Sequence, residues 1–103
     1  MTINKLAERL INELNFKDDE WGEVCGKKIT RSHRITCKPA YVMMPQKVGK
    51  GLAPVESETH LHIYVDVTDI ECDLRYDMFE TDDINKVKEL IKAIKKGTWE
   101  DFE

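Results

Sequence analysis

Two stretches of the chain alternate polar and apolar residues, and their polar positions carry most of the side chains suited to chemistry. These positions are His60, His62, Tyr64, Asp66, Glu71, Asp73, Arg75 and Asp77. Alternate side chains of a β-strand project to the same side, so a hairpin formed by residues 59–79 gathers them on one face. Histidines and carboxylates on such a face could ligate a divalent metal. A plain solvated face explains the pattern as well, because exposed sheet faces are normally polar.

The acidic side chains of this face make it the first candidate for a binding surface. Complementary charge raises the rate of association and selects partners more than it adds affinity. We therefore assign partner binding to Tyr64, Asp66, Asp69, Glu71, Asp73 and Asp77. A metal site at His60 and His62 is the lesser alternative, and we expect neither a metal nor another cofactor.

A second candidate is the sharp change of charge in the middle of the chain. Residues 26–50 contain seven basic residues and no acidic one, whereas residues 51–83 contain ten acidic residues and one basic residue. The basic side chains could bind the phosphates of a nucleotide or a nucleic acid. Those assigned to this alternative are Lys27, Lys28, Arg31, Arg34, Lys47 and Lys50.

The same basic residues have a structural interpretation. The strands that carry them could lie beside the acidic hairpin, and opposite charges on neighbouring strands are mildly stabilising. A continuous exposed basic patch would favour anion binding. Basic side chains paired with the acidic hairpin would favour a protein partner.

The spacing of the reactive residues does not indicate catalysis. The chain has three cysteines and three histidines, yet no pattern places a cysteine beside a histidine with an orienting carboxylate. The lysines and glycines of residues 46–51 lack the spacing of a phosphate-binding P-loop. The sequence therefore favours a small non-catalytic protein-binding module of the inhibitor, immunity or antagonist type, with enzymatic activity left open.

Two amphipathic helices and a sheet would position these candidates. Apolar residues recur at helical spacing over residues 3 to about 16, with Thr2 as a suitable N-cap, and again over residues 82–96, with Thr81 or Asp82 as the cap. We expect an α+β fold in which these terminal helices pack on one face of an antiparallel sheet. The sheet should have three to five strands, and the element order should be α-β-β-β-β-α.

The first half of the sheet is expected from strand-forming residues between 23 and 44, divided into two strands by a turn near residues 31–34. Pro39 indicates an edge position or a bulge, because proline cannot donate to a strand ladder. Residues 45–57 contain two prolines and two glycines without periodicity, which predicts a loop.

The hairpin over residues 59–79 changes its apolar parity near the middle. A two-residue turn at Thr68 and Asp69, or a four-residue loop, would keep both apolar sets on the same face. With the two-residue turn, Tyr64 would lie opposite Asp73.

The length of 103 residues fits a single domain spanning residues 1–103. No stretch approaches the roughly 18 apolar residues of a membrane span, and the first residues lack the apolar run of a signal peptide. Three widely spaced cysteines predict reduced thiols rather than a disulfide framework. We therefore expect a cytoplasmic protein with no membrane partner. Its partner should be another protein, or alternatively a nucleotide or nucleic acid, and its oligomeric state stays open.

Overall fold

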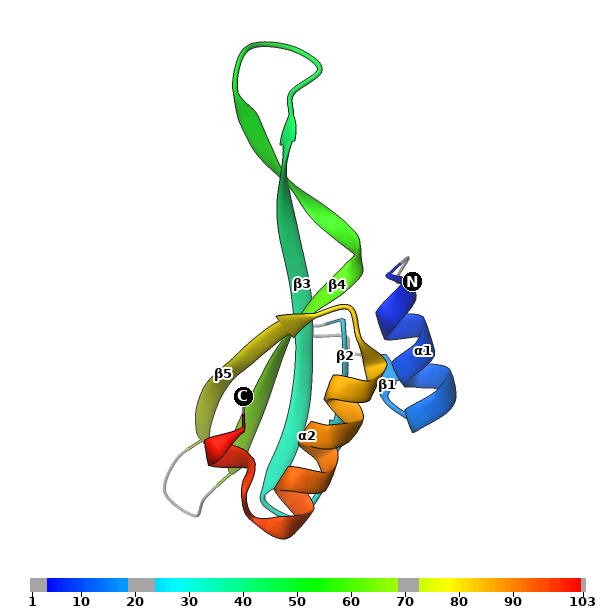
Figure 1. Ribbon diagram of the computed structural model, residues 1–103, viewed down its shortest axis with the longest axis vertical. Helices are drawn as coiled ribbons and strands as arrows, with labels where there is room; N and C mark the ends of the chain where they lie inside the picture. The colour runs from blue at the N-terminus through cyan, green and yellow to red at the C-terminus, as the bar shows by residue number, and fades with distance from the viewer. Residues whose placement is uncertain (1–3, 19–23, 69–72, 103) are drawn as a thin grey trace.

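A five-stranded antiparallel sheet and two helices form the molecule (Figure 1). The computed structural model describes residues 4–18, 24–68 and 73–102. In chain order the elements are α1 (Lys5–Leu14), β1 (Lys17–Asp18), β2 (Cys25–Lys28), β3 (His33–Pro45), β4 (Leu52–Thr68), β5 (Asp73–Thr81), α2 (Ile84–Lys96) and the 3-10 helix η1 (Trp99–Asp101). The strands lie in the spatial order β1-β2-β3-β4-β5. The expected α+β class with terminal helices is confirmed, and the short β1 adds one strand to the expected order.

Helix α1 begins later than the sequence pattern suggested. Asn4 Oδ1 accepts a hydrogen bond from the Ala7 amide at 3.0 Å, and the helix starts at Lys5. An N-cap oxygen satisfies one of the amides that the first helical turn leaves unpaired. The expected cap at Thr2, which lies outside the described residues, is therefore wrong, and Asn4 takes that role.

Helix α2 also has its cap one position further on. Asp83 accepts a hydrogen bond from the Asn85 amide at 2.9 Å. The expected Thr81 is used just before the helix, where its hydroxyl accepts from the Asp83 amide at 3.0 Å. Gly97 ends the helix with φ 79°, a left-handed conformation that glycine adopts without strain.

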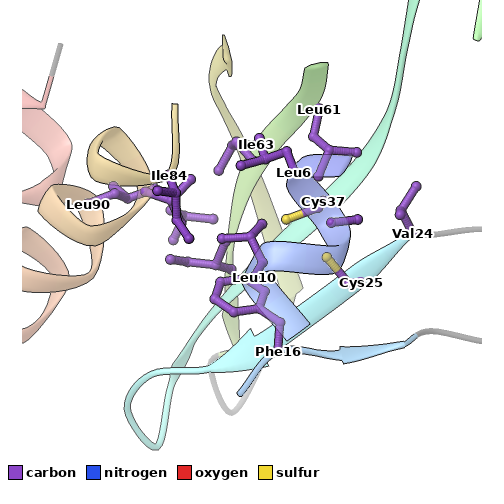
Figure 2. Close-up of a cluster of buried hydrophobic side chains, with 14 of the residues drawn as sticks. Leu6, Leu10, Phe16, Val24, Cys25, Cys37, Leu61, Ile63, Ile84 and Leu90 are labelled. Atoms are coloured by element: carbon purple, nitrogen blue, oxygen red, sulfur yellow. The ribbon is translucent and has the colours of Figure 1, made fainter. Parts of the chain in front are cut away.

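Both helices cover the same face of the sheet, where the hydrophobic core forms (Figure 2). Leu10 of α1, Leu90 of α2 and Ile63 of β4 are fully buried in it. Burying such a side chain contributes about 1.5–3 kcal/mol, so this layer holds the helices on the sheet. Cys25 and Cys37 are free thiols within the same core.

Four residues separate β4 from β5. Thr68 pairs with Asp73, and residues 69–72 lie outside the described part of the chain. The two-residue turn is therefore wrong, which agrees with the poor fit of threonine and aspartate to a type I′ turn. Tyr64 lies opposite Asp77 in the resulting register.

A two-stranded arm projects from the sheet (Figure 1). Its strands pair from Tyr41 with Glu56 to Pro45 with Leu52, and we call residues 41–56 the arm. Because of this projection the molecule measures 49 × 30 × 27 Å.

The arm replaces the loop expected over residues 45–57, which is wrong, because only residues 46–51 connect the two strands. Gly49 and Gly51 lie in this connection with φ 91° and 101°, a conformation that favours glycine. Pro45 and Pro54, both within the expected loop, led to the wrong prediction. Each strand of a two-stranded ribbon has an open edge, where a residue without an amide hydrogen is tolerated.

A large bulge in β4 lies at the base of the arm. Between the pairs Pro39–Leu61 and Tyr41–Glu56, β4 advances five residues while β3 advances two. The irregularity expected at Pro39 is thereby confirmed. The extra residues bend β4 at the base of the arm, which extends beyond the rest of the sheet (Figure 1).

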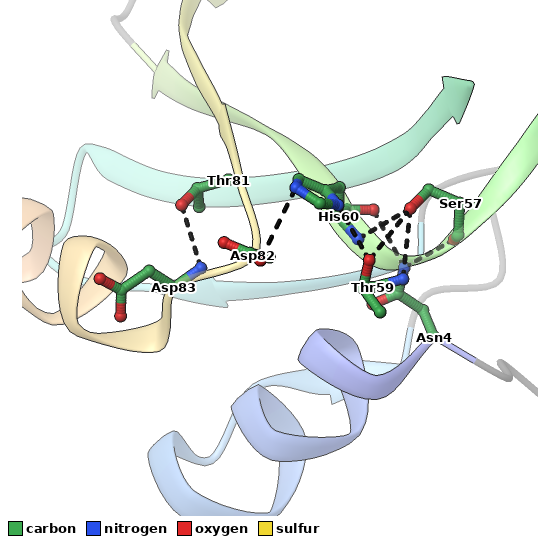
Figure 3. A network of polar contacts seen from close by, with 7 residues as sticks. All are labelled: Asn4, Ser57, Thr59, His60, Thr81, Asp82 and Asp83. Atoms are coloured by element: carbon green, nitrogen blue, oxygen red, sulfur yellow. Dashed lines mark hydrogen bonds and ion pairs between the residues drawn. The ribbon is translucent and has the colours of Figure 1, made fainter. Parts of the chain in front are cut away.

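Asn4 holds this bulge from the start of α1 (Figure 3). Its Nδ2 donates to the Ser57 and His60 carbonyl oxygens, both at 3.0 Å. Ser57 Oγ in turn accepts from the amides of Thr59 at 3.2 Å and His60 at 3.0 Å. Asn4 is only 2% exposed, so one buried side chain both caps α1 and fixes the base of the arm.

Candidate functional site

Several of the polar side chains singled out by the sequence lie on the face of the sheet opposite the helices. They alternate along the strands with core residues such as Ile35 and Ile63. We call this surface the open face; its members are Lys28, Arg34, Thr36, Lys38, His62, Tyr64, Asp66, Asp73, Arg75 and Asp77.

Tyr64 occupies the centre of the open face. The His62 ring stacks on it with centroids 4.7 Å apart. The Arg75 guanidinium carbon lies 5.4 Å from the Tyr64 ring centroid, and Lys38 Nζ lies 6.0 Å from it. Cations at this distance are attracted by the electrons of the ring. Tyr64 is therefore held by neighbours from three strands.

Asp66 lies beside Tyr64 and is paired within the face. Its two oxygens accept from Arg75 Nε at 2.6 Å and Nη2 at 2.9 Å, and Thr36 Oγ1 donates to Oδ2 at 2.6 Å. Partial burial is the largest single influence on the pKa of Asp66 and raises it. The hydrogen bonds from Arg75 and Thr36, with the charges of Arg75 and Arg34, outweigh burial and lower the pKa below its ordinary value. Asp66 is thus stabilised in its ionised form.

Asp77 and Asp73 are the more accessible carboxylates of the face. Asp77 Oδ1 contacts His62 Nε2, and its side chain is 62% exposed. Asp73 is exposed at the start of β5. The other two residues assigned to partner binding, Asp69 and Glu71, lie outside the described residues. The structure therefore brings Tyr64, Asp66, Asp73 and Asp77 onto one surface.

Part of the basic set lies on the same face. Lys28 and Arg34 are opposite each other on β2 and β3, and Arg34 is in turn opposite Asp66 on β4. The Arg34 guanidinium lies over Gly26, where a Cβ would come within 2.6 Å of Nη2. Arg31 is exposed in the connection between β2 and β3. The two competing residue sets of the sequence thus meet between β3 and β4.

Of the remaining basic residues, Lys27 lines a recess with Lys28 and Arg34, and the other two lie at a distance from it. Lys27 Nζ donates to the Leu14 carbonyl at 2.7 Å, which satisfies an oxygen in the last turn of α1. Lys47 and Lys50 lie in the connection at the tip of the arm. Of the six basic residues assigned to anion binding, Lys27, Lys28, Arg31 and Arg34 thus line two recesses that share Lys28 and Arg34, whereas Lys47 and Lys50 lie apart at the tip of the arm.

The two histidines of the metal alternative have separate partners. His60 Nε2 lies 3.7 Å from Asp82 Oδ2 (Figure 3), whereas His62 contacts Asp77. Among the described residues, no group of three or more histidines, cysteines or carboxylates is placed to hold a metal ion.

Sequence reasoning placed Arg75 on this face without assigning it a role, and it missed Lys38 and Thr36. Arg75 contacts both Tyr64 and Asp66, and a signal for it existed, since it is the single basic residue among ten acidic ones in residues 51–83. Lys38 and Thr36 also contact the centre of the face. Their contacts depend on the register between β3 and β4, which no local pattern specifies.

No family model matches this chain, and no curated protein or solved structure matches it either. Neither helix in the described part of the chain is long and apolar enough to cross a membrane.

Proposed function

We propose that the chain is a small non-catalytic protein-binding module of the inhibitor, immunity or antagonist type, and that the open face is its docking surface. The fixed position of Tyr64 is the observation that supports this most. Tyrosine and arginine are enriched among the residues that dominate binding energies. Side chains already held in place lose less conformational freedom when a partner arrives. Tyr64 and Arg75 meet both conditions.

The charges of the open face suggest what the partner presents. Lys28 and Arg34 lie over β2 and β3, whereas Asp73 and Asp77 lie over β5. A complementary partner places carboxylates against the first half and basic side chains against the second. In place of the acidic surface expected from the sequence, we propose a surface with basic side chains on one side of Tyr64 and acidic side chains on the other.

A charge reversal on β5 tests this proposal. The face variant carries Asp73→Lys and Asp77→Lys, and its control carries Glu8→Lys and Glu89→Lys, which change the net charge equally at exposed positions of α1 and α2. A partner crosslinked to the wild-type chain in its source cells and identified by mass spectrometry should be lost by the face variant and kept by the control. Retention by the face variant would contradict the proposal.

Once the partner is purified, Tyr64→Ala gives a sharper measurement. Loss of a dominant contact costs about 2 kcal/mol, which corresponds to roughly thirtyfold weaker binding. Calorimetric titration measures this change. Binding within about twofold of the wild-type value would show that Tyr64 is not a dominant contact.

A second candidate function rests on a different observation. Lys28, Arg31 and Arg34 line one recess of about 230 Å³ together with Ser32 and His33. Three cations around a recess suit a small anion such as a nucleotide phosphate better than a long nucleic acid. Calorimetric titration with inorganic phosphate and with ATP at low salt tests it. Absence of heat with both ligands would remove this candidate.

A further inference from the structure

The arm exposes apolar side chains on both of its faces. The large apolar side chains exposed on it are Tyr41, Val42, Met43, Met44, Val48, Leu52 and Val55. The register places Tyr41 and Met43 on one side of the ribbon and Val42 with Val55 on the other. Neither side therefore has a core behind it.

We expect the apolar side chains of such an arm to be covered by a binding partner. A two-stranded hairpin without further packing is marginally stable in water, and contiguous exposed apolar side chains mark interaction surfaces. What covers it can be inferred from the charges on the arm.

The charges of the arm are separated along its length. Lys47 and Lys50 lie at its tip, whereas Glu56 and Glu58 lie at its base, and all four are exposed. Residues 41–46 and 51–55 between these ends carry no charge. The five paired positions span four rises, or about 14 Å, which exceeds the screening length of about 8 Å at physiological salt. The two ends therefore do not neutralise each other within one copy.

We propose that the arm binds the arm of a second copy of this chain, with the two arms side by side and antiparallel about a two-fold axis. In this arrangement Lys47 and Lys50 of each copy meet Glu56 and Glu58 of the other, and the apolar faces pack between these ends. The contact is self-complementary, as a two-fold interface requires. It is independent of the proposed function, because the open face takes no part in it.

Other occupants fit the charges less well. A nucleic acid lying along the arm would place its phosphates beside Glu56 and Glu58, which repel them. An anionic membrane would attract only the tip, because the base carries two carboxylates.

Two charge-reversed variants of the full chain test the arrangement. Lys47→Glu with Lys50→Glu makes both ends of the arm acidic, and Glu56→Lys with Glu58→Lys makes both ends basic. Each variant alone should sediment as a monomer at concentrations where the wild-type chain is dimeric, and an equimolar mixture should recover the dimer. The matched controls are Lys92→Glu with Lys95→Glu and Glu8→Lys with Glu89→Lys, at exposed positions of the helices. Both controls should stay dimeric.

Sedimentation of the wild-type chain tests for the dimer even if a variant does not fold. A monomer over the whole accessible concentration range would overturn the proposal. So would a mixture of the two variants that remains monomeric although circular dichroism shows both to be folded. Binding of the wild-type monomer to anionic vesicles or duplex DNA through the arm would also overturn it.

A crosslinking measurement on the wild-type chain locates the contact. A carbodiimide joins a lysine directly to a carboxylate, so it should link Lys47 or Lys50 to Glu56 or Glu58. Mixing heavy- and light-isotope copies distinguishes links between copies from links within one. Dimers without these intercopy links would contradict the antiparallel arrangement.

Discussion

The open face and the arm share the strands β3 and β4, yet they expose opposite kinds of surface. On the open face Asp66 and Arg75 are paired directly, and both lie beside Tyr64. On the arm Tyr41 and Met43 are 59% and 57% exposed, and the charged residues lie at its two ends. The difference follows from the layer behind each surface. Helices cover the opposite side of the sheet behind the open face, so polar and apolar residues alternate along those strands. Both sides of the arm face solvent, so no core requires such alternation there.

The largest expected effect on stability comes from removing the side chain that fixes the base of the arm. Asn4→Ala should lower the free energy of unfolding by about 2–3 kcal/mol, because α1 loses its cap and two carbonyl oxygens, of Ser57 and His60, lose a buried donor. Urea unfolding measures the change. Asn12→Ala, at an exposed position of the same helix, should stay within about 0.5 kcal/mol of wild type. Equal effects of the two substitutions would show that Asn4 does not hold the base of the arm.

A smaller effect tests the charge matching of the open face. The pKa of Asp66 is lowered in the folded state, so its stabilising contribution is present above the unfolded-state pKa of about 3.9 and is lost as the pH falls through the lower folded-state value. Arg75 is 37% exposed, so solvent screens the pair. We therefore expect Asp66→Asn to cost about 1 kcal/mol at neutral pH.

The pH dependence provides the measurement. The difference in unfolding free energy between the wild-type chain and Asp66→Asn should shrink as the pH is lowered below about 4. Asp18→Asn, at an exposed position of β1, serves as the control substitution. A difference for Asp66→Asn that stays constant from neutral to acidic pH would contradict the charge pairing.

The smallest effect on stability is expected on the arm itself. Met43→Ser should change the unfolding free energy of the monomer by no more than about 0.5 kcal/mol, because the side chain is already exposed. The same substitution should weaken the proposed dimer in sedimentation experiments. A loss of more than about 1 kcal/mol in dilute solution would mean that Met43 is packed within one copy.

The parts of the fold that depend on residues close together in the sequence were predictable from it. The apolar stripes placed both helices, and their starts differ from expectation because Asn4 and Asp83 act as caps. The strand character of residues 59–79 was also predicted. The sequence left two lengths open for the connection between the two strands, and only the pairing of Thr68 with Asp73 decides between them.

The arm and the centre of the open face were not predictable in this way. Pro45 and Pro54 gave the signal of a loop, although both lie in strands of the arm. The bond from Thr36 to Asp66 joins residues 30 positions apart, and the pairing of Arg75 with Asp66 depends on the four residues between β4 and β5. Local patterns therefore indicated which residues share a face but not which of them touch. The binding roles of Tyr64 and its neighbours stay predictions.

The contacts of Asn4 also bear on the order in which the chain folds. Its bond to Ala7 spans three residues, whereas its bonds to Ser57 and His60 span 53 and 56. Closing a loop of that length costs conformational entropy before the contact returns any stabilisation. We therefore expect helix α1 and the strand hairpins to form first, through nearer neighbours, and the base of the arm to close only after α1 has docked on the sheet. In that order of events the direction of the arm is among the last features to form, and Asn4 sets it.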